Sequence, residues 1–102
     1  EALARTAVML RDDTQLLDEL AAEATAEVDL TGPLPITQVP TQRALRRRVL
    51  RRWLLAHGAL EPAYLHVKAV EALVTDWRGQ KWVEVPGLKI GRDAGRLVVV
   101  TH

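Results

Sequence analysis

The sequence predicts an α+β fold, with one long N-terminal helix, two further helices and then a small three-stranded antiparallel meander. Two observations predict it. Through most of residues 2–77, apolar residues recur every three or four positions, which is the period of an amphipathic helix. From Trp82 onward, they form short β-branched runs separated by glycine-containing turns, which is typical of strands. A length of 102 residues fits a single domain with a modest core.

Residues 2–28 are predicted to form the long first helix. The helix starts without a cap, and the sequence begins at Glu1 and not at a methionine, so we expect the helix to continue from an upstream domain. Three prolines make residues 31–40 an extended connector. The apolar stripe of the helix consists of Leu3, Ala7, Leu10, Leu17, Ala21, Ala24 and Val28.

The second helix is predicted between Thr41, a good N-cap residue, and Gly58, a good stop. On a helical wheel its buried side holds Leu45, Val49, Trp53 and Ala56, and Arg46 lies at the edge of the core. Arg47, Arg48 and Arg51 are expected to point well into solvent. Arg43 and Arg52 are expected to flank this exposed face.

This arginine face has two interpretations. Six of the chain's fourteen basic residues fall within ten positions, where they repel one another unless something screens them. Each arginine presents a planar fork of donors suited to phosphate, so the face could contact a polyanion. Alternatively the face is simply solvated, or its charges pair with the acidic first helix. That pairing is plausible because residues 1–30 hold eight acidic and two basic side chains, and residues 31–102 hold five acidic and twelve basic ones.

The third helix is predicted to begin at Glu61-Pro62 and to end at Gly79, with Trp77 among its inward-facing residues. Three strands are then predicted at 82–85, 88–90 and 97–100. Trp53 and Trp77 fall on buried arcs and are expected in the core, whereas Trp82 could be a stacking platform. His66 falls on the inner arc of the third helix and is expected to be a packed, hydrogen-bonded core histidine and not a catalytic base.

No motif for catalysis or for binding a cofactor or metal is present in these 102 residues. There is no phosphate-binding glycine loop, no nucleophile elbow and no Cys/His metal spacing. No apolar run is long enough to span a membrane, and the lack of cysteine fits a cytoplasmic location. We therefore expect a non-enzymatic, cytoplasmic chain.

Several segments resemble bacterial tRNA(Ile)-lysidine synthetase. The most specific are Leu-Arg-Arg-Arg-Val-Leu-Arg-Arg-Trp-Leu at 45–54 and Leu-Val-Thr-Asp-Trp-Arg-Gly-Gln at 73–80. Residues 5–18, 66–70 and 83–97 add to the resemblance in the same order along the chain. The resemblance implies a connecting helix at residues 1–30 and a substrate-binding domain at residues 31–102, both following a catalytic domain.

The family joins lysine to the wobble cytidine of the isoleucine tRNA with a CAU anticodon, using ATP. The resemblance places ATP and magnesium in the N-terminal catalytic domain, whose Ser-Gly-Gly-x-Asp-Ser loop is not found here. It implies that this chain binds tRNA and contacts its own catalytic domain. The candidate RNA-binding residues are Arg43, Arg47, Arg48 and Arg51, followed by Arg52, Lys89, Arg92 and Arg96. The alternative is a structural domain that forms a homodimer, or packs against another domain, through its amphipathic first helix.

Overall fold

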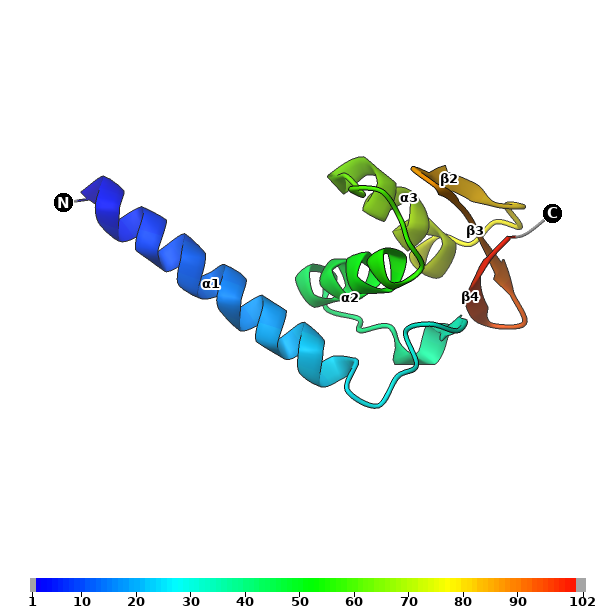
Figure 1. The fold of residues 1–102 in the computed structure, drawn as a ribbon, viewed down its shortest axis with the longest axis horizontal. Helices are drawn as coiled ribbons and strands as arrows, with labels where there is room; N and C mark the ends of the chain where they lie inside the picture. Colours follow the sequence, from blue (N-terminus) through cyan, green and yellow to red (C-terminus); the bar gives the residue numbers. More distant parts are fainter. Residues whose placement is uncertain (1, 101–102) are drawn as a thin grey trace.

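The fold consists of three helices and a four-stranded antiparallel sheet, which confirms the α+β prediction (Figure 1). The computed structural model describes residues 2–100 and the side chains of residues 12–100. The helices are α1 (Ala2–Ala24), α2 (Arg43–Ala56) and α3 (Tyr64–Thr75), with a 3-10 turn η1 (Ile36–Gln38). The strands are β1 (Leu34–Pro35), β2 (Val83–Val85), β3 (Leu88–Asp93) and β4 (Arg96–Val99).

The elements stack in the order sheet, α3, α2, α1. Helix α3 contacts β2, β3 and α2, and the opposite side of α2 contacts α1, which projects from the rest of the chain (Figure 1). One apolar cluster joins these layers. Its fully buried large side chains are Leu34, Val49, Leu50, Trp53, Leu54, Val70, Leu73, Ile90 and Leu97.

The prediction of a three-stranded meander was incomplete, because the sheet has four strands in the order β1-β4-β3-β2. The predicted strands correspond to β2, β3 and β4. The added strand β1 pairs Leu34 with Leu97 and Pro35 with Arg96. Because β1 has only two residues and one of them is a proline, its sequence shows no strand pattern. Its pairing with β4 follows from the burial of Leu34 beside Leu97. Pro35 is tolerated because β1 is an edge strand.

Helix α1 is shorter than predicted. It ends at Ala24, where the Thr25 hydroxyl donates a hydrogen bond of 2.8 Å to the carbonyl of Ala21. Of the predicted apolar stripe, Ala21 is buried, Leu17 and Val28 are half-buried, and Ala24 is exposed. The first three stripe residues lie outside the part whose side chains are described. None of the helices in the described part is long and apolar enough to cross a membrane.

Helix α3 is also shorter than predicted, and this overturns the prediction for Trp77. The helix runs only from Tyr64 to Thr75, so Trp77 lies in the following loop and its side chain is 41% exposed. Trp53 is fully buried, as predicted. His66 is hydrogen-bonded as predicted, because its Nδ1 accepts a hydrogen bond of 2.9 Å from the backbone N–H of Ala63, but it is only half-buried and does not belong to the core.

Helix α2 has nearly the predicted bounds. Its N-cap is Gln42 and not Thr41: the Gln42 Oε1 accepts a hydrogen bond of 2.7 Å from the backbone N–H of Leu45. Gly58 follows the helix with φ of 89°, a conformation that glycine adopts without strain, so the predicted stop is confirmed.

Candidate nucleic-acid interface

The buried face of α2 is rotated from its predicted position. Leu50 and Leu54 are fully buried with Val49 and Trp53, whereas Ala56 is exposed. The rotation arises because α2 packs between α1 and α3, so that two faces of the helix are covered. This rotation brings the arginines in the first half of α2 closer to neighbouring helices than the helical wheel of the sequence predicted.

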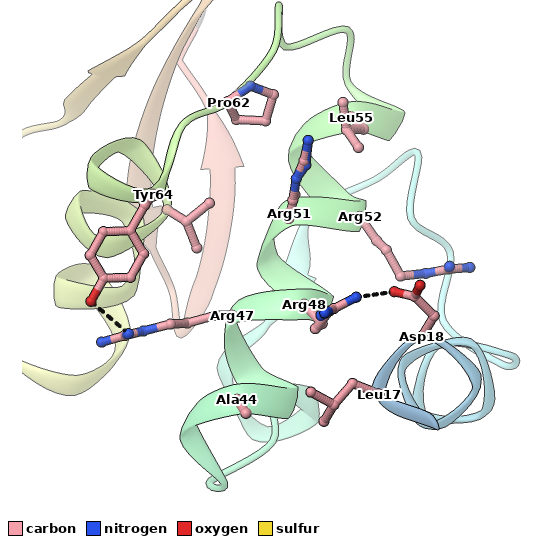
Figure 2. Close-up of a pocket in the computed structure, with 11 residues that line it drawn as sticks. Leu17, Asp18, Ala44, Arg47, Arg48, Arg51, Arg52, Leu55, Pro62 and Tyr64 are labelled. Atoms are coloured by element: carbon pink, nitrogen blue, oxygen red, sulfur yellow. Dashed lines mark hydrogen bonds and ion pairs between the residues drawn. The ribbon is translucent and has the colours of Figure 1, made fainter. Parts of the chain in front are cut away.

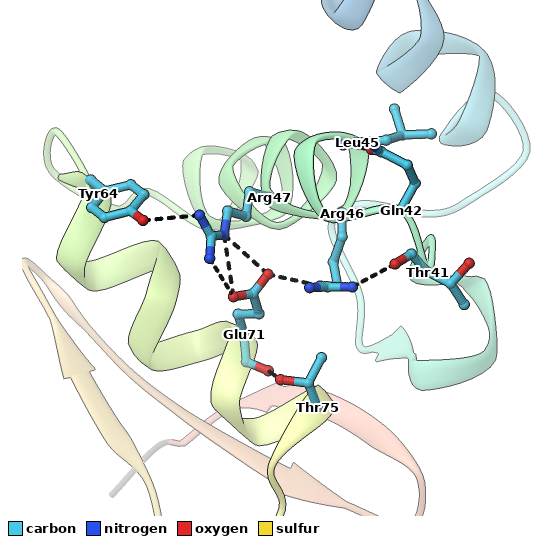
Figure 3. Close-up of polar contacts among 8 residues, drawn as sticks. All are labelled: Thr41, Gln42, Leu45, Arg46, Arg47, Tyr64, Glu71 and Thr75. Carbon is cyan, nitrogen blue, oxygen red and sulfur yellow. Dashed lines mark hydrogen bonds and ion pairs between the residues drawn. The ribbon is translucent and has the colours of Figure 1, made fainter.

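Glu71 of α3 binds two of these arginines (Figure 3). The Nε of Arg46 donates to the Glu71 carboxylate at 2.8 Å, and the Nε and NH2 of Arg47 donate to it at 3.1–3.2 Å. Arg46 also donates to the carbonyl of Thr41 at 2.7 Å, and Arg47 to the hydroxyl of Tyr64 at 3.0 Å. Arg46 thus lies at the core edge as predicted, with 13% of its side chain exposed. The prediction that Arg47 points into solvent was wrong: its side chain is only 23% exposed.

Glu71 and Arg47 shift each other's pKa. Burial alone raises the pKa of Glu71, but the hydrogen bonds from Arg47 and Arg46 outweigh it and lower the pKa below its usual value of 4.5. The hydrogen bond to Glu71 is the main reason that the pKa of Arg47 is raised. Glu71 and Arg47 are therefore ionised at neutral pH, and Glu71 neutralises part of the positive charge of α2.

Arg48 pairs with the acidic first helix. Its NH1 donates to the carboxylate of Asp18 on α1, and its side chain is 29% exposed (Figure 2). This is the pairing that the sequence left open as an alternative to solvation. The prediction that Arg48 points well into solvent was therefore wrong.

The three other arginines of α2 have no such partner. Arg43, Arg51 and Arg52 are exposed, and no residue whose side chain the structure describes pairs with them. Arg51 lies one helical turn beyond Arg47, and Arg52 one turn beyond Arg48, and both are exposed on α2. Their charges are the ones that α2 offers to a partner outside the described chain.

An open groove of about 980 Å³ gathers four of the candidate arginines (Figure 2). Its floor is the outer surface of α2, α1 forms one side, and the start of α3 forms the other. The charged residues that line it are Arg47, Arg48, Arg51, Arg52 and Asp18. The uncharged ones are Leu17, Ala44, Leu55, Pro62, Tyr64 and Val67.

The candidates on the sheet lie elsewhere. Lys89 and Arg92 belong to β3, and Arg96 belongs to β4. Helix α3 lies between these strands and α2, and none of the three residues lines the groove. The Nζ of Lys89 is 5.2 Å from the ring centroid of Trp82. Arg92 is 5.4 Å from the ring centroid of Trp77 and donates a hydrogen bond of 2.9 Å to the carbonyl of Leu73. Arg96 is exposed. The eight candidates therefore occupy at least two separate surfaces.

The sequence reasoning missed Glu71 and Tyr64. Glu71 lies between Val70 and Leu73 on the apolar side of α3, and a carboxylate at such a position needs cationic partners. That signal was available in the sequence. Tyr64 gave no signal, because its place in the groove depends on how α3 begins after the buried Pro62.

Comparison with known proteins finds relatives along nearly the whole chain. Residues 40–98, from the start of α2 to β4, match the family model described as "TilS substrate binding domain". The chain is 44% identical to the tRNA(Ile)-lysidine synthase of Nocardia farcinica, covering 97% of this chain and 33% of that protein. It is also 44% identical to the synthase of Streptomyces coelicolor, covering 97% of this chain and 30% of that protein. For the synthase of Thermobifida fusca the identity is 42%, over 99% of this chain and 32% of that protein.

The chain thus spans about a third of the length of these relatives. No solved structure gives a significant match. The family match covers α2 and α3, which form the floor and one side of the arginine groove, and most of the sheet. The chain belongs to the TilS substrate binding domain family.

Proposed function

We propose that this chain holds tRNA for a tRNA(Ile)-lysidine synthase and has no catalytic activity of its own. The relatives that carry this name support the proposal, as does the family's description as a substrate-binding domain. In the proposed parent enzyme, a separate catalytic domain uses ATP and magnesium to join lysine to the wobble cytidine of the isoleucine tRNA with a CAU anticodon. This chain then contacts both the tRNA and that catalytic domain.

The observation that carries the proposal is the exposed pair Arg51 and Arg52. Arg47, Arg48, Arg51 and Arg52 repel one another at spacings of three and four residues along α2. Glu71 and Asp18 offset this repulsion at Arg47 and Arg48, but no described residue does so at the other two. An RNA phosphate backbone supplies the missing anions, and arginine forks suit it. Such contacts position the RNA and carry no sequence information.

The decisive experiment measures tRNA affinity at several salt concentrations. Changing Arg51→Ala together with Arg52→Ala should weaken binding roughly tenfold or more near 0.1 M salt. The slope of log affinity against log salt should fall by roughly 1.5 to 2, since each phosphate contact contributes about 0.7–0.9.

The matched control removes the same charge from another surface. Arg78→Ala with Lys81→Ala also deletes two exposed cations. Among the residues whose side chains are described, Arg78 pairs only with exposed Asp76, and neither cation lines the groove. The control pair should leave the slope nearly unchanged. Equal losses for both pairs would show that the chain binds RNA through general charge and not through the groove.

The rival function is dimerisation or interdomain packing through α1. Leu16 and Leu20 of α1 are 53% and 38% exposed, which leaves an apolar surface for a second copy. Membership in a substrate-binding family does not favour this rival. It predicts a mass that rises with concentration in sedimentation equilibrium, and no RNA affinity.

The isolated chain should not hydrolyse ATP, because it has no phosphate-binding loop. A colorimetric phosphate-release assay with magnesium checks this. ATP turnover that stays with the purified chain and is abolished by a substitution within it would contradict the proposal.

A further inference from the structure

Tyr64 is an exposed aromatic side chain at the edge of the arginine groove. It is the only tyrosine of the chain, the first residue of α3, and 63% exposed. Tyrosine rings usually bury most of their surface, so an exposed ring in a groove is a candidate contact for a ligand. Figure 2 shows the ring across the groove from Asp18, with its hydroxyl directed at Arg47.

The ring is held in place before any ligand arrives. Its hydroxyl accepts a hydrogen bond of 3.0 Å from Arg47, which Glu71 holds in turn (Figure 3). The guanidinium carbon of Arg47 lies 5.2 Å, and the Nζ of Lys68 5.5 Å, from the ring centroid. A ring fixed in this way loses little conformational entropy when a ligand stacks on it.

The groove combines this ring with unpaired positive charge. Arg51 and Arg52 lie on its floor without a described partner, and the exposed Leu55 adds apolar surface beside them. A nucleotide has the complementary chemistry, since it carries an anionic phosphate and a flat apolar base. Aromatic stacking with a basic groove is the usual way in which proteins bind single-stranded nucleic acid.

We propose that this groove binds an unpaired nucleotide of the RNA, with its base stacked on Tyr64 and its phosphate on Arg51 and Arg52. The inference rests on the proposed tRNA-binding function and adds a distinct element to it. Bases inside a duplex are already stacked on each other and cannot reach an aromatic side chain in this way. The groove should therefore bind a single strand more tightly than a duplex. Phosphate contacts alone would not produce this preference, because both forms of RNA carry phosphates.

The binding experiment compares a short single-stranded RNA with a blunt duplex of the same sequence. Tyr64→Ala should weaken binding of the single strand roughly five- to a hundredfold, the usual effect of losing one stacked base, and leave duplex binding unchanged. Tyr64→Phe keeps the ring and should retain most of the affinity. Trp77→Ala is the matched control, because it removes another exposed ring beside an arginine, away from the groove. It should change neither affinity.

The outcomes separate this inference from the proposed function. If Tyr64→Ala changes nothing while Arg51→Ala/Arg52→Ala weakens both RNAs, the stacking inference fails and tRNA binding stands. If the arginine pair also has no effect, the proposed function itself fails. Loss of single-strand binding in Trp77→Ala but not in Tyr64→Ala would move the stacking site to the sheet and overturn the inference.

A measurement on the unmodified chain removes any dependence on the folding of the variants. Because the chain has one tyrosine, isotope labelling of tyrosine rings gives a single set of ring resonances in the NMR spectrum. Single-stranded RNA should shift these resonances upfield through the ring current of a stacked base. The blunt duplex should not. Saturable binding of the single strand without a change in these resonances would overturn the inference.

Discussion

The Glu71 side chain places one carboxylate against two arginines while only 8% of its surface is exposed. Removing a carboxylate from water is unfavourable unless its charge is paired and its oxygens accept hydrogen bonds. Arg46 and Arg47 supply four such hydrogen bonds, and none of the buried side-chain polar atoms in the described part of the chain lacks a partner. Glu71 therefore stabilises the junction of α2 and α3.

Replacing Glu71 should destabilise the chain much more than replacing an exposed acid. Glu71→Ala leaves two half-buried arginines without their partner, and we expect a loss of about 2 kcal/mol, less than for a fully buried pair because the arginines keep some contact with water. Asp76→Ala, which breaks the exposed pair with Arg78, should cost less than about 0.5 kcal/mol. Urea denaturation gives both values. Equal values would contradict the role assigned to Glu71.

The same residue makes stability depend on pH. The pKa of Glu71 is lower in the folded chain than its usual value of 4.5, so on acidification the unfolded chain takes up this proton first. The stabilisation is therefore fully present above about pH 4.5 and is lost as the pH falls through the pKa of the folded chain. Melting temperatures measured from pH 6 to pH 3 should fall less for Glu71→Gln than for the unchanged chain. Parallel curves would show that Glu71 does not titrate differently on folding.

For single residues, the sequence predicted the exposure of some arginines of α2 but not the residues with which the others form ion pairs. Helical periodicity correctly placed Arg51 outside the core and Arg46 at its edge. It could not predict that Arg47 meets Glu71 or that Arg48 meets Asp18, because those partners lie 24 and 30 residues away on other helices. Contacts of that kind depend on how the helices pack.

Among the elements, the connector between α1 and α2 is fixed by side chains of α2. The Nε1 of Trp53 donates a hydrogen bond of 2.8 Å to the carbonyl of Gly32, and the Nε2 of His57 lies 3.0 Å from the same oxygen. The two rings contact each other, with centroids 4.6 Å apart. These contacts hold the connector where Leu34 can enter the core and β1 can pair with β4.

Trp53→Phe should therefore weaken the link between connector and helix. The substitution removes the hydrogen-bond donor and leaves a space in the core, and we expect it to lower the free energy of unfolding by about 2–3 kcal/mol. Trp82→Phe is the control, because this side chain is 40% exposed and should change stability by less than about 1 kcal/mol. Thermal unfolding followed by circular dichroism compares them. Similar melting temperatures would mean that the Trp53 contacts contribute little.

The elements themselves were predictable to different degrees. Helix α2 was predicted within two residues at either end, because a strong apolar period and a glycine stop define it. Strand β1 was missed, since its two residues form a strand only through pairing with β4. The predicted end of α3 ran four residues too far because Gly79 resembles a stop signal, although the helix ends at Thr75 and leaves Trp77 exposed.

Across the whole molecule, the acidic and the basic part of the sequence lie against each other in the fold. The acidic helix α1 packs against the basic helix α2, and Asp18 neutralises part of the arginine surface there. The positive charge left over lies on the outer surface of α2, above all at Arg51 and Arg52. This layout presents charge to a phosphate backbone, and the described residues that line the groove include no asparagine or glutamine, the side chains that pair with the edge of adenine.

The isolated chain should therefore bind different tRNAs with similar affinity. Phosphate contacts and stacking on one ring are nearly independent of sequence, so an isoleucine tRNA with a CAU anticodon and an unrelated elongator tRNA should differ by less than about threefold in dissociation constant. Fluorescence anisotropy with both tRNAs at matched salt measures this. A tenfold or greater preference for the isoleucine tRNA, abolished by Arg51→Ala/Arg52→Ala, would show that the groove recognises sequence or a shape peculiar to that tRNA. Similar affinities would instead show that the groove does not discriminate between tRNAs.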